Sequence, residues 1–188
     1  MTARDITTDV AVIGAGPVGL FTLFQCGMLG LKATAIDALA EPGGQCMALY
    51  PEKPIFDVPA FSSVDAGELV ERLLDQAEPF QPEMLLGSEA VTLERTADDG
   101  FMVGTERGDR VSGRAVIIAA GAGAFGPNRP PLAGLEAFEG TSVHYMVRRR
   151  EDFRGKRLVI AGGGDSALDW TIARPVILTN GARAKTIK

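Results

Sequence analysis

The chain has 188 residues, of which 46% are hydrophobic and 23% are charged, and its formal net charge is −5 at pH 7. This composition is typical of a globular protein, and the length suffices for one core or two small ones. The acidic balance argues against a nucleic-acid binder, which needs an excess of Lys and Arg to neutralise phosphates. No run approaches the roughly 20 apolar residues that cross a bilayer, so no membrane-embedded segment is expected.

The first predicted elements form one β–α–β unit over residues 8–37. Residues 10–13 are the apolar run of a buried parallel strand, and apolar side chains recur at helical spacing over residues 20–28. Gly30 is placed to end this helix. Because the strand begins by about Thr8, no room is left for a secretory signal, and a cytoplasmic protein is expected.

Residues 41–61 contain four prolines together with Gly43 and Gly44, which predicts an ordered loop without a long helix or a central strand. Helical periodicity returns over residues 65–76, with Asp65 among the residues available to cap the helix. Residues 89–115 alternate short β-like runs with turn signals, which predicts a three-stranded antiparallel insertion. A buried strand ending in small residues follows over residues 115–123.

Residues 125–157 lack sustained periodicity and are expected to connect two nucleotide-binding units. An apolar strand, a glycine turn and a helix then recur over residues 157–170, which repeats the N-terminal arrangement. The connector carries the only basic cluster of the chain, made of Arg148, Arg149, Arg150, Arg154, Lys156 and Arg157. This cluster could steer an acidic partner, or its side chains could simply be solvated.

Three glycines in the string GAGPVG form the first motif that carries chemistry. The string lies between a predicted strand and a predicted helix, the context that makes it a dinucleotide fingerprint. Gly14 permits a tight turn, Gly16 lets the backbone approach a pyrophosphate, and Gly19 lets helix and strand pack closely. Asp37 lies at the end of the second strand, where it can accept hydrogen bonds from a ribose; a solvated carboxylate is the alternative.

A second glycine loop, GGGDSA, has Gly162, Gly164 and Ala167 in the GxGxxA form, with Asp165 between them. Two such loops predict two nucleotides. A flavin in one loop and a nicotinamide cofactor in the other would let hydride pass between the two rings. A turn that only caps a helix is the alternative for this second loop.

The remaining candidate functional residues are single side chains outside the two glycine motifs. Gln45 lies in EPGGQ, where backbone could approach a flavin, and Tyr50 could stack on an isoalloxazine ring or simply pack against the protein. Cys26 and Cys46 follow no CxxC spacing, so neither a redox dithiol nor a zinc site is predicted, and both are expected to be reduced, buried and inert. His144 has no partner in a nucleophile or metal motif and is assigned no role.

Together these segments resemble the thioredoxin-reductase-like ferredoxin–NADP reductases, flavoproteins of bacteria and archaea. The likeness runs from Thr8 to about Trp170 through GAGPVGLF, DALAEPGGQCMALYPEKPIFDVPAF, IIAAGAGAFGP, FEGTSVHYMV and EDFRGKRLVIAGGGDSALDW, in the family's order. It implies an α/β fold: a Rossmann-like FAD-binding domain with a small antiparallel β insertion, followed by the start of a second Rossmann-like domain that binds NADP.

The resemblance also assigns roles to individual residues, with Tyr50 stacking on the isoalloxazine ring and Ala90 contributing mainly backbone. The FAD-binding residues it implies are Gly14, Gly16, Gly19, Asp37, Gln45, Tyr50, Ala90 and Phe125. The NADP-binding residues it implies are Gly162, Gly164, Asp165 and Ala167. No side chain is assigned as a catalytic acid, base or nucleophile, because the flavin carries the chemistry.

The implied activity is electron transfer between NADPH and ferredoxin or flavodoxin, in a homodimer. Hydride would pass from NADPH to flavin N5, and single electrons would leave the flavin. Related thioredoxin reductases carry a CxxC dithiol before the second glycine loop, but this chain reads SVHYMVRRRED there, so no route through a protein disulfide is expected. Two alternatives stay open: an FAD-dependent NAD(P)H reductase of a small disulfide or quinone, and a non-catalytic, truncated FAD-binding fragment.

The chain departs from the family's pattern toward its end. Family members continue through the rest of the NADP domain and a returning FAD segment, so this chain is expected to be the N-terminal part of a longer reductase. We predict an FAD-binding domain over residues 1–122, a connector over 123–155 and a partial NADP-binding domain over 156–188. The Arg174-Pro175 pair is expected to stop the helix of the second loop early.

Overall fold

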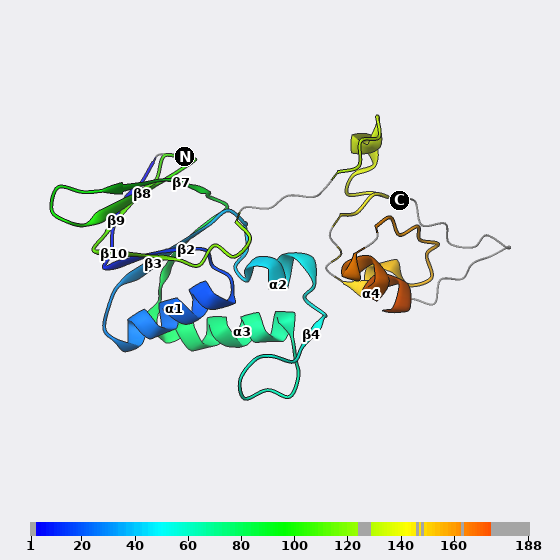
Figure 1. Cartoon of the computed structure of the whole chain (residues 1–188), viewed down its shortest axis with the longest axis horizontal. Helices are drawn as coiled ribbons and strands as arrows, with labels where there is room; N and C mark the ends of the chain where they lie inside the picture. Colours follow the sequence, from blue (N-terminus) through cyan, green and yellow to red (C-terminus); the bar gives the residue numbers. More distant parts are fainter. Residues whose placement is uncertain (1–2, 124–128, 146, 148, 163, 174–188) are drawn as a thin grey trace. The chain divides into compact units, whose positions relative to one another are not determined.

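The computed structural model describes residues 3–123, 129–145, 147, 149–162 and 164–173. The chain divides into two compact units, Met1–Arg148 and Arg149–Lys188. In the larger unit, helices cover one face of a parallel sheet, and a second sheet covers the other face (Figure 1). No helix in the described part of the chain is both long enough and apolar enough to cross a membrane.

The middle layer is a parallel sheet with the strand order β10-β2-β3-β6. Its strands are β2 (Val10–Ile13), β3 (Ala33–Asp37), β6 (Glu83–Leu86) and β10 (Ala115–Ile118). The register pairs Ile13 with both Ile36 and Ile118, so the carboxyl ends of three strands meet at one edge. Since β3 and β10 lie on opposite sides of β2, this edge is where the strand order reverses and where a crevice forms in open α/β sheets.

The helices α1 (Pro17–Met28) and α3 (Ala66–Ala77) cover one face of this sheet. Successive residues of a strand point to opposite faces, so Val10 and Val12 pack against Leu20, Leu23 and Val70 of the helices. This cluster is the larger of the two buried cores and fixes the position of the α1 N-terminus against β2.

The end of α1 confirms the role predicted for Gly30. Gly30 has φ +70° and directly follows the C-cap residue Leu29. The N–H of Leu31 donates to the carbonyl oxygen of Cys26 at 2.9 Å, which satisfies a carbonyl of the last turn.

The outer sheet has the order β1-β9-β8-β7. Its strands are β1 (Asp5–Thr7), β7 (Ala90–Arg95), β8 (Phe101–Thr105) and β9 (Arg110–Gly113). The three strands β7 to β9 are antiparallel, which confirms the predicted insertion. Ala11 of β2 faces this sheet and packs with Ile36, Val103 and Val111, so the insertion belongs to the same folded body as the parallel sheet.

The stretch predicted as a loop contains regular structure. It forms the short helix α2 (Gly44–Leu49) and the strand β4 (Pro54–Ile55), which pairs with β5 (Val64–Asp65). Gly43 and Gly44 have φ values of 112° and 56°, so the glycine pair turns the chain into α2 and does not merely interrupt it. As predicted, this stretch holds no long helix and no central strand, but the loop prediction was wrong where the six-residue helix α2 forms.

Short 3₁₀ turns complete the described secondary structure, at Glu78–Phe80, Leu135–Phe138 and Arg150–Phe153. At the start of α3, Asp65 is the N-cap residue as predicted, but within the described residues its side chain makes no capping hydrogen bond.

The unit Arg149–Lys188 contains the helix α4 (Asp165–Ala173). The strand predicted at its start is not formed: residues 156–162 have no strand conformation. Val159, expected to be buried in that strand, is 96% exposed. A parallel strand needs a neighbour to pair with, and the described part of this unit holds none. The helix of the predicted second domain is present as α4. The domain boundaries at 122 and 155 stay a prediction.

Thr34 on β3 gives a prediction about stability. Its side chain is fully buried, and its hydroxyl has no hydrogen-bond partner among the described residues. We expect Thr34→Val to leave the free energy of unfolding unchanged or to raise it by up to about 1 kcal/mol, because an unpaired buried hydroxyl is costly. The buried Thr8 hydroxyl donates to the carbonyl oxygen of Lys32 at 2.9 Å, so Thr8→Val should instead lose about 1 kcal/mol. Urea unfolding measures both, and equal losses would show that Thr34 is bonded.

Candidate functional site

The turn between β2 and α1 requires glycine at two positions. Gly14 has φ +106°, and a Cβ there would overlap the carbonyl oxygen of Ala119 just after β10. A Cβ on Gly19 would overlap the carbonyl oxygen of Gly14. The first glycine thus sets the turn, and the other lets the helix approach the strand.

Gly16 is the N-cap residue of α1, and Pro17 takes the first helical position. Within the described residues no side chain caps this end, so the N–H groups of the first turn are available to an outside acceptor. The turn also contacts the loop before α2. The N–H of Gly43 donates to the carbonyl oxygen of Ala15 at 2.8 Å, and a Cβ on Gly44 would lie 3.0 Å from the Gly16 Cα.

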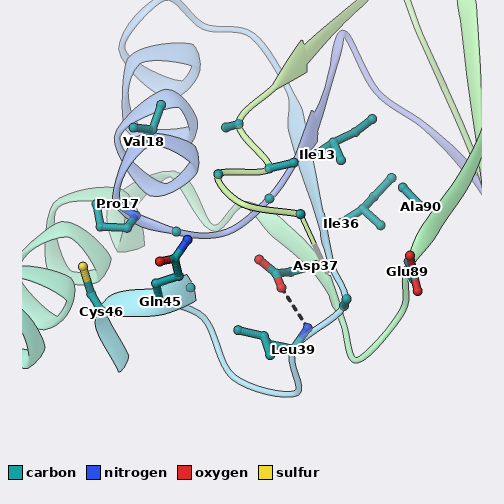
Figure 2. A pocket seen from close by; sticks show the side chains of 18 residues that line it. Ile13, Pro17, Val18, Ile36, Asp37, Leu39, Gln45, Cys46, Glu89 and Ala90 are labelled. Atoms are coloured by element: carbon teal, nitrogen blue, oxygen red, sulfur yellow. Dashed lines mark hydrogen bonds between the residues drawn. The ribbon is translucent and has the colours of Figure 1, made fainter. Parts of the chain in front are cut away.

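Asp37 ends β3 with its carboxylate beside the glycine turn. Oδ2 accepts a hydrogen bond from the N–H of Ala15 at 2.6 Å, and Oδ1 accepts one from the N–H of Leu39 at 2.8 Å, drawn as a dashed line in Figure 2. A carboxylate has about four lone-pair sites, so the same group can still accept from a ribose hydroxyl. Asp37 therefore both holds the turn and supplies an acceptor to the site.

These elements border a pocket of about 360 Å³ at the carboxyl edge of the parallel sheet. The volume lies within the range of small-ligand sites, roughly 300–1,000 Å³. Its walls combine the backbone of the glycine turn with the apolar side chains of Ile13 and Ile36 (Figure 2). The predicted FAD-binding residues that line it are Gly14, Gly16, Asp37, Gln45 and Ala90.

The other predicted FAD-binding residues do not line this pocket. Gly19 lies behind it and acts through packing. Tyr50 follows α2 as its C-cap residue, half-buried, with the Lys53 Nζ 5.9 Å from its ring centroid. Stacking of Tyr50 on a flavin stays a prediction, and Phe125 lies outside the described residues.

Several lining residues were missed from the sequence, among them Leu39, Cys46, Glu89 and four residues after β10, namely Ala119, Ala120, Gly121 and Gly123. The residues after β10 had a signal, since their small side chains allow the backbone there to pass close to Gly14. Glu89 had none, because its place depends on how the chain connects β6 to β7.

Both cysteines are free, and Cys46 allows a chemical test of the pocket. Burial raises the pKa of the Cys46 thiol; burial, with Asp9 as a smaller cause, also raises the pKa of Cys26, which is 5% exposed. A raised pKa lowers the thiolate fraction at every pH below it. We therefore expect iodoacetamide to alkylate Cys46 more slowly than free cysteine at about pH 8, with a midpoint shifted to higher pH.

Mass spectrometry of timed samples measures this alkylation, with Cys46→Ser as the blank for the site. Saturating FAD should slow the reaction further, because Cys46 lines the pocket. A pH midpoint at or below that of free cysteine would contradict the burial of this thiol, and an unchanged rate with bound FAD would place the ligand elsewhere.

The second glycine loop leads into α4, and the structure describes it without Gly163. Gly162 has φ +155°, and a Cβ there would lie 3.3 Å from the Cβ of Ala167. The N–H groups of Ala167 and Leu168 donate to the carbonyl oxygen of Gly164 at 3.0 and 3.3 Å, which begins α4. Asp165 is the first residue of α4, and nothing is described of its side chain. NADP binding by this loop stays a prediction.

The basic cluster is partly engaged in local contacts. Arg154 pairs with Glu151 at 2.7 Å, and the Lys156 Nζ lies 5.3 Å from the Phe153 ring centroid. Exposed pairs of this kind contribute little to stability. Steering of an acidic partner by this cluster stays a prediction.

A glycine-rich turn between strand and helix, a carboxylate at the end of the next strand, and a pocket at the carboxyl edge of a parallel sheet define a dinucleotide-binding α/β domain. Residues 8–178 match the family model described as pyridine nucleotide-disulphide oxidoreductase. The chain belongs to the pyridine nucleotide-disulphide oxidoreductase family.

Within this family, the chain is similar to curated ferredoxin–NADP reductases. A ferredoxin–NADP reductase of Rhodospirillum rubrum is 61% identical over 171 residues, which cover 89% of this chain and 50% of the relative. The ferredoxin–NADP reductase of Paramagnetospirillum magneticum is 59% identical over 166 residues, which cover 88% of this chain and 49% of the relative. The chain thus spans about half the length of the curated relatives it matches.

Solved structures agree on the fold. An oxidised steroid monooxygenase bound to NADP superposes with a TM-score of 0.67 at 25% identity, over 85% of this chain and 35% of that chain. The thioredoxin reductase of Streptococcus pyogenes gives 0.54 at 23% identity, over 70% of this chain and 40% of that chain, which shows the fold alone. The predicted fold class, a Rossmann-like α/β domain with an antiparallel insertion, is confirmed.

Proposed function

We propose that this chain is the FAD-binding part of a ferredoxin–NADP reductase, which passes electrons between NADPH and ferredoxin or flavodoxin. The observation that carries the proposal is the pocket in which the glycine turn, the α1 N-terminus and Asp37 meet. The names of the relatives support ferredoxin as the partner. Flavodoxin as acceptor, a homodimeric state and a cytoplasmic location are further parts of the proposal that rest on the sequence alone.

The residues present fit the adenosine diphosphate part of FAD. The first turn of α1 offers N–H donors and the positive end of the helix dipole to a pyrophosphate. Asp37 offers carboxylate oxygens to a ribose, and Ile36 and Ala90 give apolar walls suited to a planar base. When bound, FAD supplies hydride acceptance from NADPH and release of single electrons.

The positions of the two cysteines support the expectation that no electron route runs through a protein dithiol. Cys26 lies in the core between the parallel sheet and the helices, whereas Cys46 lines the nucleotide pocket. Both thiols have a raised pKa, which disfavours the thiolate that disulfide exchange needs. A flavin-dependent reductase of a quinone differs from the main proposal only in its acceptor.

One observation favours a second candidate, an FAD-binding chain that does not turn over NADPH. The strand expected before the second glycine loop is not formed, although α4 is. A loop without its strand presents its N–H groups less precisely to a pyrophosphate.

The test is an anaerobic titration of the purified chain loaded with FAD. Bleaching of the bound flavin by NADPH, followed by reoxidation with added ferredoxin, is the result expected of the main proposal. Reoxidation by a quinone but not by ferredoxin would change the acceptor. A yellow protein that NADPH leaves oxidised would establish the second candidate, and protein that never binds FAD would overturn both.

A further inference from the structure

Glu89 borders the end of the pocket where Asp37 lies. It belongs to the connection between β6 and β7, lines the pocket next to Ala90, and is exposed at its rim (Figure 2). The connection is fixed beside β3, because the N–H of Ser88 donates to the carbonyl oxygen of Asp37 at 2.9 Å. Two carboxylates from different elements therefore border the part of the pocket assigned to adenosine.

No basic side chain lines this pocket in the described part of the chain. Arg107 does not line the pocket, but it lies near the β6–β7 connection. Its Nη2 is 2.9 Å from the position that a Cβ on Gly87 would take. The turn at Gly87 is tied to the pocket wall by its N–H, which donates to the carbonyl oxygen of Leu39 at 2.7 Å. The charged side chains that line the pocket at this end are therefore both acidic.

This charge matters because a phosphate monoester on the adenosine ribose carries roughly −1.5 to −2 at pH 7. Such a group would meet the carboxylates of Asp37 and Glu89, whereas free ribose hydroxyls can donate to a carboxylate. NADPH carries a 2′-phosphate and FAD does not. A protein with two glycine loops can therefore keep NADPH out of its FAD site by rejecting this phosphate.

We propose that Glu89 acts with Asp37 as a specificity-determining residue, so that this site accepts adenine nucleotides with free ribose hydroxyls and rejects 2′-phosphorylated ones. The inference rests on the proposed FAD site and adds a residue to it. The exposed carboxylate of Glu89 acts through its charge. It therefore weakens binding of 2′-phosphorylated nucleotides more than it strengthens binding of nucleotides with free ribose hydroxyls.

The test uses two probes that differ only in the 2′-phosphate: AMP and adenosine 2′,5′-bisphosphate. Each is titrated against FAD bound to the full chain, and FAD fluorescence reports displacement. In the wild type AMP should bind more tightly than the bisphosphate. Glu89→Gln should shrink this preference by roughly twofold to fivefold, and Glu89→Lys by roughly fourfold to 25-fold, with AMP affinity almost unchanged.

The matched control is Glu94→Gln, an exposed glutamate on β7 that does not line the pocket. Glu94 lies about 15 Å along the chain from Glu89, which exceeds the Debye length of about 8 Å at physiological salt. The Glu94→Gln variant should therefore prefer AMP over the bisphosphate as strongly as the wild type does. Raising the salt from about 0.05 M to about 0.5 M should shrink the effect of Glu89, which a purely structural role would not predict.

Equal preferences in wild type, Glu89→Gln and Glu89→Lys would overturn the role of Glu89 while leaving FAD binding intact. Wild-type protein that binds the bisphosphate as tightly as AMP would overturn the selectivity and point to Arg107 as a phosphate ligand. Failure to bind FAD or AMP at all would instead overturn the proposed function on which the inference rests.

Discussion

Gly14→Ala is expected to abolish FAD binding and to lower the free energy of unfolding by roughly 2–6 kcal/mol. About 1–3 kcal/mol comes from the positive φ of +106°, and about 1–3 kcal/mol from the overlap of the new Cβ with the carbonyl oxygen of Ala119. The carbonyl oxygen belongs to the backbone, and the position of a Cβ is fixed by its own backbone, so neither atom can move aside cheaply. Urea unfolding and FAD fluorescence quenching measure the two effects.

The matched control is Gly30→Ala. Gly30 also has a positive φ, of +70°, but a Cβ there would meet nothing within 4 Å. Only the conformational cost, roughly 1–2 kcal/mol, should appear, and FAD binding should persist. If both variants lose the same stability and both bind FAD, the close contact between the glycine turn and the end of β10 is wrong.

Asp37→Asn is expected to weaken FAD binding by roughly 10- to 100-fold and to destabilise the chain by about 1.5–3 kcal/mol. The asparagine amide keeps one oxygen, so its NH₂ group must face one of the two backbone N–H groups that the carboxylate now accepts from, those of Ala15 and Leu39. The ribose acceptor is weakened at the same time.

Asp65→Asn serves as the control for the loss of an acidic side chain. Asp65 also stands at the start of a helix, but no capping hydrogen bond from its side chain is described. Its replacement should change stability by no more than about 0.5 kcal/mol and leave FAD affinity unchanged. An Asp37→Asn protein that behaves like Asp65→Asn would show that the carboxylate neither holds the turn nor contacts the ligand.

The part of the site predicted from sequence is the part whose geometry is local. Gly14, Gly16 and Asp37 belong to one β–α–β unit, and parallel pairing of β2 with β3 brings the carboxylate to the turn. A fixed motif therefore encodes both its residues and their arrangement.

The features missed depend on pairing between distant segments. β1 has only three residues and is ordered by β9, with Asp5 opposite Arg110, while β6 is ordered by β3. Short strands of this kind carry little periodicity of their own. Glu89 and Leu39 reach the pocket for the same reason, because the position of the β6–β7 connection is set by hydrogen bonds to residues around Asp37.

The prediction of a strand over residues 157–161 was wrong because an apolar sequence alone does not make a strand. Its sequence is apolar, but an apolar run becomes a strand only when neighbouring strands accept its hydrogen bonds. Glycines commonly interrupt helices, but the positive φ values of Gly43 and Gly44 lead the chain into α2, which places Gln45 at the pocket.

Amide hydrogen exchange of the full chain, with and without saturating FAD, tests most directly whether the glycine turn and Asp37 hold FAD. We expect slower exchange over residues 14–20 and 37–46 on binding, with no change at the β7–β8 turn around Asp98. Unchanged exchange over residues 14–20 in the presence of bound FAD would contradict this assignment.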